Sequence, residues 1–313
     1  MAPILPTFFV VGAAKAGTTS LWRYLAAHPG IHMSLIKEPN YFAKDIDTGA
    51  FSAEYKNQLV RDYRPWVNGK AFQPAHIAHV SDLNDYAGLF ADARHGYPIG
   101  ECSASYLFSC AAAEEIAATI KNPRIVILLR DPKERAFSQY LMDSRVGCAT
   151  GTFLEEVRRD FNAIRKEWGT SRLYIENGMY FAQVKRYLDV FGPAQIRVWL
   201  YEDIKQDLRG FVRGVYAFVG ARQDFEPDLR QRHNGAVLPR FHRLNSWMFR
   251  CGLKGGWDRI IPPILLKGAK RLFYKRNSLR LGQAEREELL PFFREDIGKL
   301  QVLIGRDLSG WLI

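Results

Sequence analysis

The stretch Phe8-Phe9-Val10-Val11-Gly12-Ala13-Ala14-Lys15-Ala16-Gly17-Thr18-Thr19-Ser20-Leu21 decides the fold of this 313-residue chain. Its first four residues are apolar and predict a short buried strand, and residues 18–27 predict a helix. The loop between them consists of small residues and one lysine. A strand, such a loop and a helix N-terminus together favour a phosphate site, because the free N–H groups and the positive end of the helix dipole face the anion.

The loop differs from the common P-loop in the place of its lysine. The pattern G-x-x-x-x-G-K-[ST] has lysine directly after the second glycine, whereas here the order from Gly12 to Thr19 is G-x-x-K-x-G-T-T. Lys15 is therefore aimed differently, and the chemistry need not be cleavage of ATP or GTP. Taken alone, the loop is also compatible with a solvated lysine in a β–α turn.

Composition favours a soluble globular protein with an anionic partner. The chain is 47% hydrophobic and 25% charged, and its formal net charge is +11. The four cysteines form no C-x-x-C pair, so we expect neither a zinc site nor a disulfide framework. No basic region precedes the first apolar run, and no run reaches about 18 apolar residues. We therefore expect a cytoplasmic protein.

The order of predicted elements is that of an α/β protein. Strands are predicted at 8–11, 31–33, 97–101, 124–129 and 195–200, and helices at 18–27, 82–93, 111–119, 132–142, 153–168, 179–191, 208–219 and 284–303, with a further helix near 55–60. Strands that alternate with helices form a parallel sheet. We predict a single domain, 1–313, with a central parallel β-sheet flanked by helices and a P-loop-like loop.

Two further positions point to the same ligand. Arg130 follows the strand 124–129, and Ser138 lies two turns into the next helix, which Asp131 caps. Ligands of open parallel sheets bind beyond the carboxyl ends of the strands. Taken separately, Arg130 is explained by a surface ion pair and Ser138 by a hydroxyl bonded to its own helix. Together with the Lys15 loop they predict a ligand with two separated phosphate-type groups.

The Glu38 carboxylate is predicted to lie near the Lys15 loop. It lies 23 residues after Lys15, one β–α–β return away, which brings it to the same end of the sheet. Pro39 keeps it out of the α region, so its carboxylate sits in an extended or turn segment.

These motifs resemble the sulfotransferases that use 3′-phosphoadenosine 5′-phosphosulfate (PAPS), especially bacterial ones related to heparan-sulfate sulfotransferases. The stretch 12–20 resembles the 5′-phosphosulfate loop of the family, and 130–138 resembles its 3′-phosphate motif. Lys37-Glu38-Pro39 is similar to the segment with the catalytic carboxylate. Tyr201-Glu202-Asp203 and 305–312 also look like recurring family stretches.

The resemblance implies a mechanism and a set of site residues. Glu38 would be the general base for the acceptor hydroxyl, and Lys15 would stabilise the charge that grows on the leaving adenosine 3′,5′-bisphosphate (PAP). No metal would be required. The residues implied in donor binding are Lys15, Ala16, Gly17, Thr18, Thr19, Ser20, Arg130, Ser138 and, from a late loop, Arg232 and His233.

Two positions depart from the family pattern. Cys102 stands where related polysaccharide enzymes often have lysine, so the sequence does not support a second catalytic lysine there. Asn40 stands where some relatives have histidine. Both departures bear on the acceptor rather than on the donor.

The segment 240–280 differs from the rest of the chain. It holds eleven Lys and Arg residues and one acid, Asp258, so nearly all of the net charge is local. Bulky apolar residues alternate with the basic ones, a composition typical of interfacial segments. The alternative is a basic outer face on an ordinary packed lid. We expect this segment to cover the acceptor cleft and to contact an amphiphile, such as a glycolipid, at a membrane surface; a soluble saccharide or natural-product hydroxyl is the other expectation.

Two other classes of protein are possible. A P-loop kinase or NTPase predicts lysine directly after Gly17 and a magnesium-binding acid after a strand, and neither is found. A nucleic-acid-binding protein predicts basic residues and stacking aromatics spread along a groove, but here the charge lies in one late apolar segment. The sequence therefore favours the enzyme that the resemblance implies, one that transfers a sulfuryl group and binds no nucleic acid.

Overall fold

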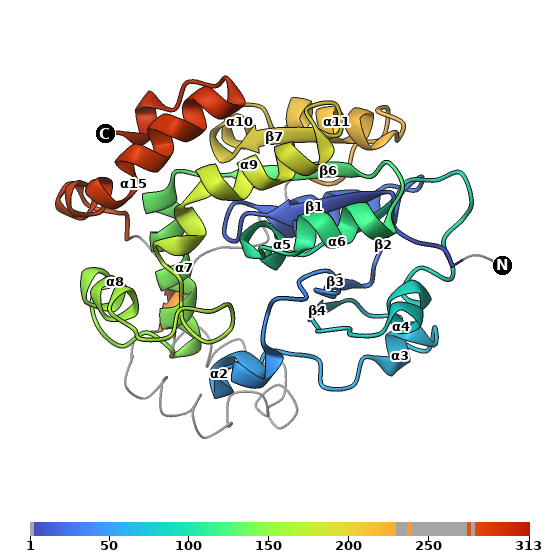
Figure 1. Ribbon diagram of the computed structural model, residues 1–313, viewed down its shortest axis with the longest axis horizontal. Helices are drawn as coiled ribbons and strands as arrows, with labels where there is room; N and C mark the ends of the chain where they lie inside the picture. Colours follow the sequence, from blue (N-terminus) through green and yellow to red (C-terminus); the bar gives the residue numbers. More distant parts are fainter. Residues whose placement is uncertain (1–2, 230–236, 240–273, 277–278) are drawn as a thin grey trace.

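A five-stranded parallel sheet forms the centre of the molecule (Figure 1). The structure is a computed structural model that describes residues 3–229, 237–239, 274–276 and 279–313. The strand order is β2–β5–β1–β6–β7, and the α/β class predicted from the sequence is confirmed. The strands are β1 (Phe8–Gly12), β2 (His32–Met33), β5 (Ile99–Cys102), β6 (Arg124–Leu129) and β7 (Ile196–Leu200).

The middle strands are apolar because both of their faces are covered. Every residue of β1 is buried, and so is β6 from Ile125 to Leu129. Val10 of β1 pairs with Cys102 of β5 on one side and with Val126 of β6 on the other. Since the strands are parallel, their carboxyl ends lie at one edge of the sheet, where the Lys15 loop and Arg130 follow directly.

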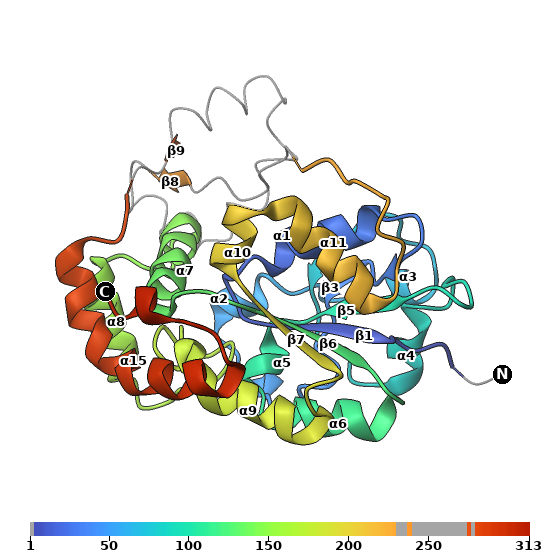
Figure 2. The same cartoon turned by 90° about the horizontal axis from the view of Figure 1, so that it is seen from above.

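Helices cover both faces of this sheet. Figure 2 shows α1, α10 and α11 on one side of the strands and α5, α6 and α9 on the other. Their bounds are α1 (Thr18–Ala27), α5 (Ser105–Phe108), α6 (Ala112–Thr119), α9 (Tyr180–Phe191), α10 (Tyr201–Gln206) and α11 (Leu208–Val219). The predicted bounds of α1 and α11 are confirmed.

The C-terminal helix α15 (Gln283–Ile304) is fastened to the rest of the fold by two carboxylates. The Asp296 carboxylate accepts the backbone N–H of Tyr180 at 2.8 Å and that of Phe181 at 3.1 Å, so α15 caps the N-terminus of α9. Just beyond the helix, Arg306 forms an ion pair with Asp203 of α10 at 2.8 Å. The two recurring stretches at 201–203 and 305–312 therefore contact each other.

Glu38 belongs to a second, small sheet that the sequence did not predict. Strand β3 (Ile36–Glu38) pairs in parallel with β4 (Ala75–Ile77), with Glu38 opposite Ile77. The short helices α3 (Arg64–Val67) and α4 (Leu83–Gly88) lie beside this pair in Figure 1.

Several predicted element bounds are wrong. The helix expected at 153–168 is α8 (Phe153–Phe161), which ends early because the Asp160 carboxylate accepts the backbone N–H groups of Arg172 and Tyr174 and turns the chain back. The helix expected near 55–60 is α2 (Ala53–Lys56), and that at 82–93 is only α4. Helix α7 (Pro132–Val146) runs a turn further than expected, to Gly147 in the left-handed conformation at φ 88°. Strands β8 (Val237–Pro239) and β9 (Tyr274–Arg276) form an unpredicted antiparallel pair.

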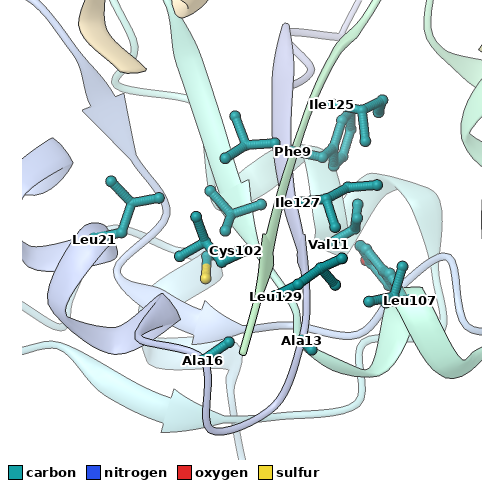
Figure 3. Close-up of a cluster of buried hydrophobic side chains, with 14 of the residues drawn as sticks. Phe9, Val11, Ala13, Ala16, Leu21, Cys102, Leu107, Ile125, Ile127 and Leu129 are labelled. Carbon is teal, nitrogen blue, oxygen red and sulfur yellow. The ribbon is translucent and has the colours of Figure 1, made fainter. Parts of the chain in front are cut away.

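An apolar cluster packs against the inner side of the Lys15 loop. Figure 3 shows Ala13 and Ala16 of the loop and Leu21 of α1 among side chains of β1, β5 and β6, with Leu107 of α5 beside them. Ala16 is fully buried, and Ala13 is 2% exposed. Ala13 and Ala16 are therefore core residues, and their packing fixes the position of the loop at the strand ends.

Candidate functional site

A cavity of about 790 Å³ lies at the carboxyl ends of the strands. It is lined by the Lys15 loop, by Glu38, by Arg130 and by the α7 face that holds Ser138. Topology thus brings together four sites predicted from separate stretches of sequence. Further lining residues come from α2 and the turn after it, from β4, from the loop at 168–173, and from α15 and the segment just before it: Tyr55, Gln58, His76, Ile77, Trp168, Gly169, Ser171, Arg172, Leu173, Arg280 and Arg286.

The loop backbone takes conformations that its sequence permits. Gly17 has φ 103°, which favours glycine, and it starts α1 as an N-cap without a side-chain cap. Gly12 has φ 155°, and a Cβ there would lie 2.6 Å from the Cβ of Leu107. Lys15 itself is left-handed, at φ 69°. The loop therefore turns its lysine into the cavity and presents the first turn of α1 to it.

The predicted loop residues divide into two groups. Lys15, Gly17, Thr18, Thr19 and Ser20 line the cavity. Ala16 does not: its side chain lies in the apolar cluster, and its N–H donates to the carbonyl of Ala13 at 3.1 Å. The loop faces the cavity at Lys15 and again from Gly17 onward.

The Lys15 ammonium forms no salt bridge across the described ranges. It contacts the thioether sulfur of Met142 at 3.3 Å. Burial lowers the pKa of Lys15 to about 8, and Arg130 adds to this effect while Asp143 opposes it. A half-buried lysine with this environment gains most from an anion that enters the cavity.

Arg130 connects the two predicted phosphate motifs. Its guanidinium donates to the backbone carbonyl of Lys15 at 3.3 Å and to Glu134 at 3.1 Å, and it lies 4.8 Å from the centre of the Tyr201 ring. Its Nε is buried and has no partner among the residues that the structure describes. An orphaned donor at this place fits an oxyanion.

Glu134 and Arg286 line the cavity but were not predicted as site residues from the sequence. Glu134 accepts from Arg130 on one oxygen and from Arg286 of α15 on the other, and Arg286 also lies 3.5 Å from Asp131. The spacing of four residues from Arg130 to Glu134 could have revealed the first pair. Nothing local could have revealed Arg286, because α15 reaches the cavity only through the tertiary fold.

Ser138 lines the cavity from α7, on the same helix as Glu134 and Met142. It is partly exposed, so its hydroxyl is accessible to a ligand. Arg232 and His233, the late-loop candidates, lie outside the described residues.

Glu38 is 7% exposed, and its carboxylate contacts the ammonium of Lys37. Burial acts to lower the pKa of Lys37, but the Glu38 carboxylate outweighs it and the pKa is raised. Lys37 therefore remains charged and keeps a cation beside the candidate base. Cys102, where the sequence lacks the lysine of some relatives, is fully buried, and burial raises the pKa of its thiol to about 12.

The wall beyond Glu38 is aromatic and polar. The indole N–H of Trp168 donates to the hydroxyl of Tyr55 at 2.9 Å, and His76 lies on β4 next to Ile77. Burial raises the pKa of Tyr55, with Glu38 adding to the effect, so its hydroxyl stays protonated. Tyr55 and His76 lay in a stretch without clear periodicity, and Trp168 lay at the end of an expected helix. Only their aromatic character could have marked them.

A model of the sulfotransferase family matches residues 6–226, which include every residue that lines the cavity except Leu279, Arg280, Leu281 and Arg286. The chain belongs to the sulfotransferase family. This assignment favours an enzyme of the sulfotransferase type over the kinase and nucleic-acid-binding alternatives.

Solved and curated relatives support the assignment. A crystal structure of a sulfotransferase from Alicyclobacillus acidocaldarius is 31% identical, with a TM-score of 0.69 over 98% of this chain and 99% of that one. The membrane-associated sulfotransferase kil1 of Dictyostelium discoideum is 31% identical over 44% of this chain and 22% of its own length. Human carbohydrate sulfotransferase 15 is 24% identical over 69% of this chain and 44% of its own length. The chain thus spans less than half the length of these two curated relatives.

The described residues lack two structural features. No group of three histidine, cysteine or acidic side chains there is arranged to hold a metal ion. The helices in the same part of the chain include none that is long and apolar enough to cross a membrane. The expectation of a reaction without metal stays a prediction.

Proposed function

We propose that this sulfotransferase moves the sulfuryl group of PAPS to a hydroxyl of a carbohydrate, glycolipid or natural-product acceptor. The observation that carries the proposal is the convergence of Lys15, Arg130 with Ser138, and Glu38 on one cavity. Two groups suited to binding an anion and one suited to accepting a proton then line a single cavity.

The donor end of the cavity suits a nucleotide with two anionic groups. Lys15 and the first turn of α1 would hold the 5′-phosphosulfate, since that turn starts without a side-chain cap. Arg130, Ser138 and Arg286 would hold the 3′-phosphate, because Arg130 still has an unused buried donor there.

The chemistry assigned to the chain is proton removal and charge stabilisation. Glu38 would accept the proton of the acceptor hydroxyl while that oxygen forms a bond to sulfur. The bond between sulfur and the bridging phosphate oxygen breaks, and PAP leaves with the electron pair. Lys15 would stabilise the charge that grows on this oxygen. Lys37, paired with Glu38, would place a positive charge beside the base.

The acceptor would bind along the wall beyond Glu38. Trp168 and Tyr55 offer aromatic faces with polar edges, which suits a saccharide. The carbohydrate sulfotransferases among the relatives support this acceptor class. Of the basic segment 240–280, the described Arg280 lines the cavity, and most of the rest lies outside the described residues. Contact of that segment with a membrane-bound amphiphile is part of the proposal, and equal sedimentation with and without anionic liposomes would contradict it.

Calorimetry with PAP and with ATP tests the donor, and a transfer assay with Glu38→Gln tests the base. We expect PAP to bind in preference to ATP, and binding of ATP alone or of neither would overturn the proposal. Glu38→Gln should lower transfer by about 10²- to 10⁴-fold with PAP affinity unchanged. Retained turnover in this variant would remove Glu38 as the base.

A further inference from the structure

Glu101 is a buried carboxylate that the proposed chemistry does not use. It lies on β5 and is fully buried. Three hydroxyls donate to it: Ser103 at 2.5 Å on Oε1, Tyr86 at 2.5 Å on Oε2 and Tyr106 at 3.1 Å on Oε2. Burial raises the pKa of Glu101 to about 7, and the three donors oppose this rise. A buried carboxyl group is costly, so its surroundings indicate a purpose beyond packing.

The direction of these hydrogen bonds fixes the hydroxyls. Each hydroxyl has one proton, and when it donates that proton to Glu101 its lone pairs must face elsewhere. Ser103 accepts the backbone N–H of Asn40 at 3.1 Å, and Tyr106 accepts that of Phe42 at 3.1 Å. Two N–H groups of the segment that directly follows Glu38 therefore depend on hydroxyls that Glu101 orients.

Asn40 extends this support to Glu38 itself. It adopts the left-handed conformation, at φ 56°, which asparagine tolerates. Its side-chain N–H₂ donates to the carbonyls of Glu38 at 2.9 Å and Ala78 at 2.8 Å, and its side-chain oxygen accepts from Ser105 at 2.5 Å. The Glu38 carbonyl also accepts from the N–H of Ala78 at 2.8 Å. The carbonyl oxygen of the base thus accepts two hydrogen bonds, one from Asn40 and one from Ala78.

We propose that Glu101 is a positioning residue for Glu38, acting through Ser103, Tyr106 and Asn40. The inference rests on the proposed function, in which Glu38 is the base. A displacement of about 1 Å of a reacting group lowers a rate about 100-fold, so a buried network that fixes one carboxylate has a catalytic effect. It also explains why Asn40 stands at its position: its side chain bonds the base's own carbonyl.

Glu101→Gln tests the inference, with Tyr86→Phe as the matched control. The amide keeps the shape but faces at least one hydroxyl with a donor, which disturbs the orientation of Ser103 or Tyr106. Tyr86 also donates to Glu101, but its hydroxyl receives no N–H of the 40–42 segment in the described hydrogen bonds. We expect Glu101→Gln to lower kcat about 10- to 100-fold, with the affinity for PAP and the KM for the donor within about twofold of wild type. Tyr86→Phe should keep kcat within about twofold.

Hydrogen exchange gives a readout that needs no activity. In Glu101→Gln the amides of Asn40 and Phe42 should exchange at least about tenfold faster, and in Tyr86→Phe they should not. Unchanged protection, or equal losses of kcat in the two variants, overturns the inference. Should Glu101→Gln fail to fold, Ser103→Ala and Tyr106→Phe each remove one link and should lower kcat separately. Failure of the proposed function would instead appear in the wild-type protein, as absence of PAP binding.

Discussion

The guanidinium of Arg130 donates to the carbonyl oxygen of Lys15 at 3.3 Å. This contact joins two motifs that are far apart in the sequence, the end of β6 and the loop after β1. It fixes the distance between the two predicted anion sites, because the lysine backbone cannot shift without moving the arginine. The spacing of the sites is therefore a property of adjacent parallel strands.

Binding of PAP should depend on pH through Lys15. Its pKa is lowered to about 8 in the free protein, and a bound anion raises it. Above pH 7 the phosphates are already dianionic, so affinity should be constant to about pH 8 and then fall by about tenfold per pH unit as the ammonium is lost. Calorimetry from pH 7 to pH 9.5 measures this, and Lys15→Met should bind weakly without the fall. A wild-type affinity that is flat to pH 9.5 would contradict the assignment.

Arg130→Ala should remove the preference for a 3′-phosphate. A charge-assisted hydrogen bond contributes about 1.5–3 kcal/mol, so PAP affinity should fall by about 10- to 100-fold. Affinity for adenosine 5′-phosphate, which lacks that group, should change little. Arg124 at the other end of β6 is the control: it is exposed and bonds the carbonyl of Phe218, and Arg124→Ala should keep the preference. Equal losses for both nucleotides would place Arg130 elsewhere.

Gly12→Ala should destabilise the protein. The new Cβ would lie 2.6 Å from Leu107, in a backbone conformation unfavourable for any side chain. Overpacking of this kind costs about 1–3 kcal/mol in the free energy of unfolding, measurable by urea denaturation. Gly298→Ala, in the open surroundings of α15, should instead stabilise by about 0.4–1 kcal/mol. Opposite signs for the two substitutions are the expected result.

Asp296→Ala should weaken the start of α9. It removes the acceptor for two backbone N–H groups, and loss of a cap costs about 0.5–2 kcal/mol. Glu295→Ala, beside it but exposed and paired with Lys299, should leave the free energy of unfolding nearly unchanged, because exposed ion pairs contribute little. An equal effect of both substitutions would contradict the role of Asp296 as the cap of α9.

The same carboxyl group has a pH signature. Burial raises the pKa of Asp296 to about 6, above its value in the unfolded chain, so folding favours the protonated carboxyl group. The contribution of this pKa difference to the free energy of unfolding is complete below about pH 4. That contribution is lost as the pH rises through about 6. The free energy of unfolding of the wild type relative to Asp296→Asn should therefore decline across that window, and a constant difference would contradict the assignment.

Local signals predicted the central fold well. β6 and α11 have their predicted bounds, because each has a clear local pattern: β6 is a continuous β-branched apolar run, and α11 is an amphipathic helix. The pairing of β3 with β4 could not be predicted, since each strand has only three residues and depends on contacts across the chain. Helix α8 ended early for a similar reason, because a returning loop binds Asp160.

The site divides in the same way. Lys15, Arg130 and Ser138 could be predicted because their stretches follow neighbouring parallel strands and so meet at one edge of the central sheet. Glu38 lines the same cavity from the separate β3–β4 sheet, which the sequence did not predict. Arg286, Trp168 and Tyr55 could not, since helix packing and loop paths place them at the cavity. Lys37 belongs to the predicted Lys37-Glu38-Pro39 motif, but only the structure shows that its side chain is buried and contacts Glu38.

The Met142 sulfur beside Lys15 has a consequence for chemical labelling. A lysine with its pKa lowered to about 8 carries an appreciable fraction of neutral amine at physiological pH, and a thioether does not block it. Among the lysines of this chain, Lys15 should therefore react early with amine-directed acylating reagents that fit the cavity. Nucleotide present during labelling should shield it, so one modified peptide in a mass spectrum would report donor-site occupancy before any acceptor is known.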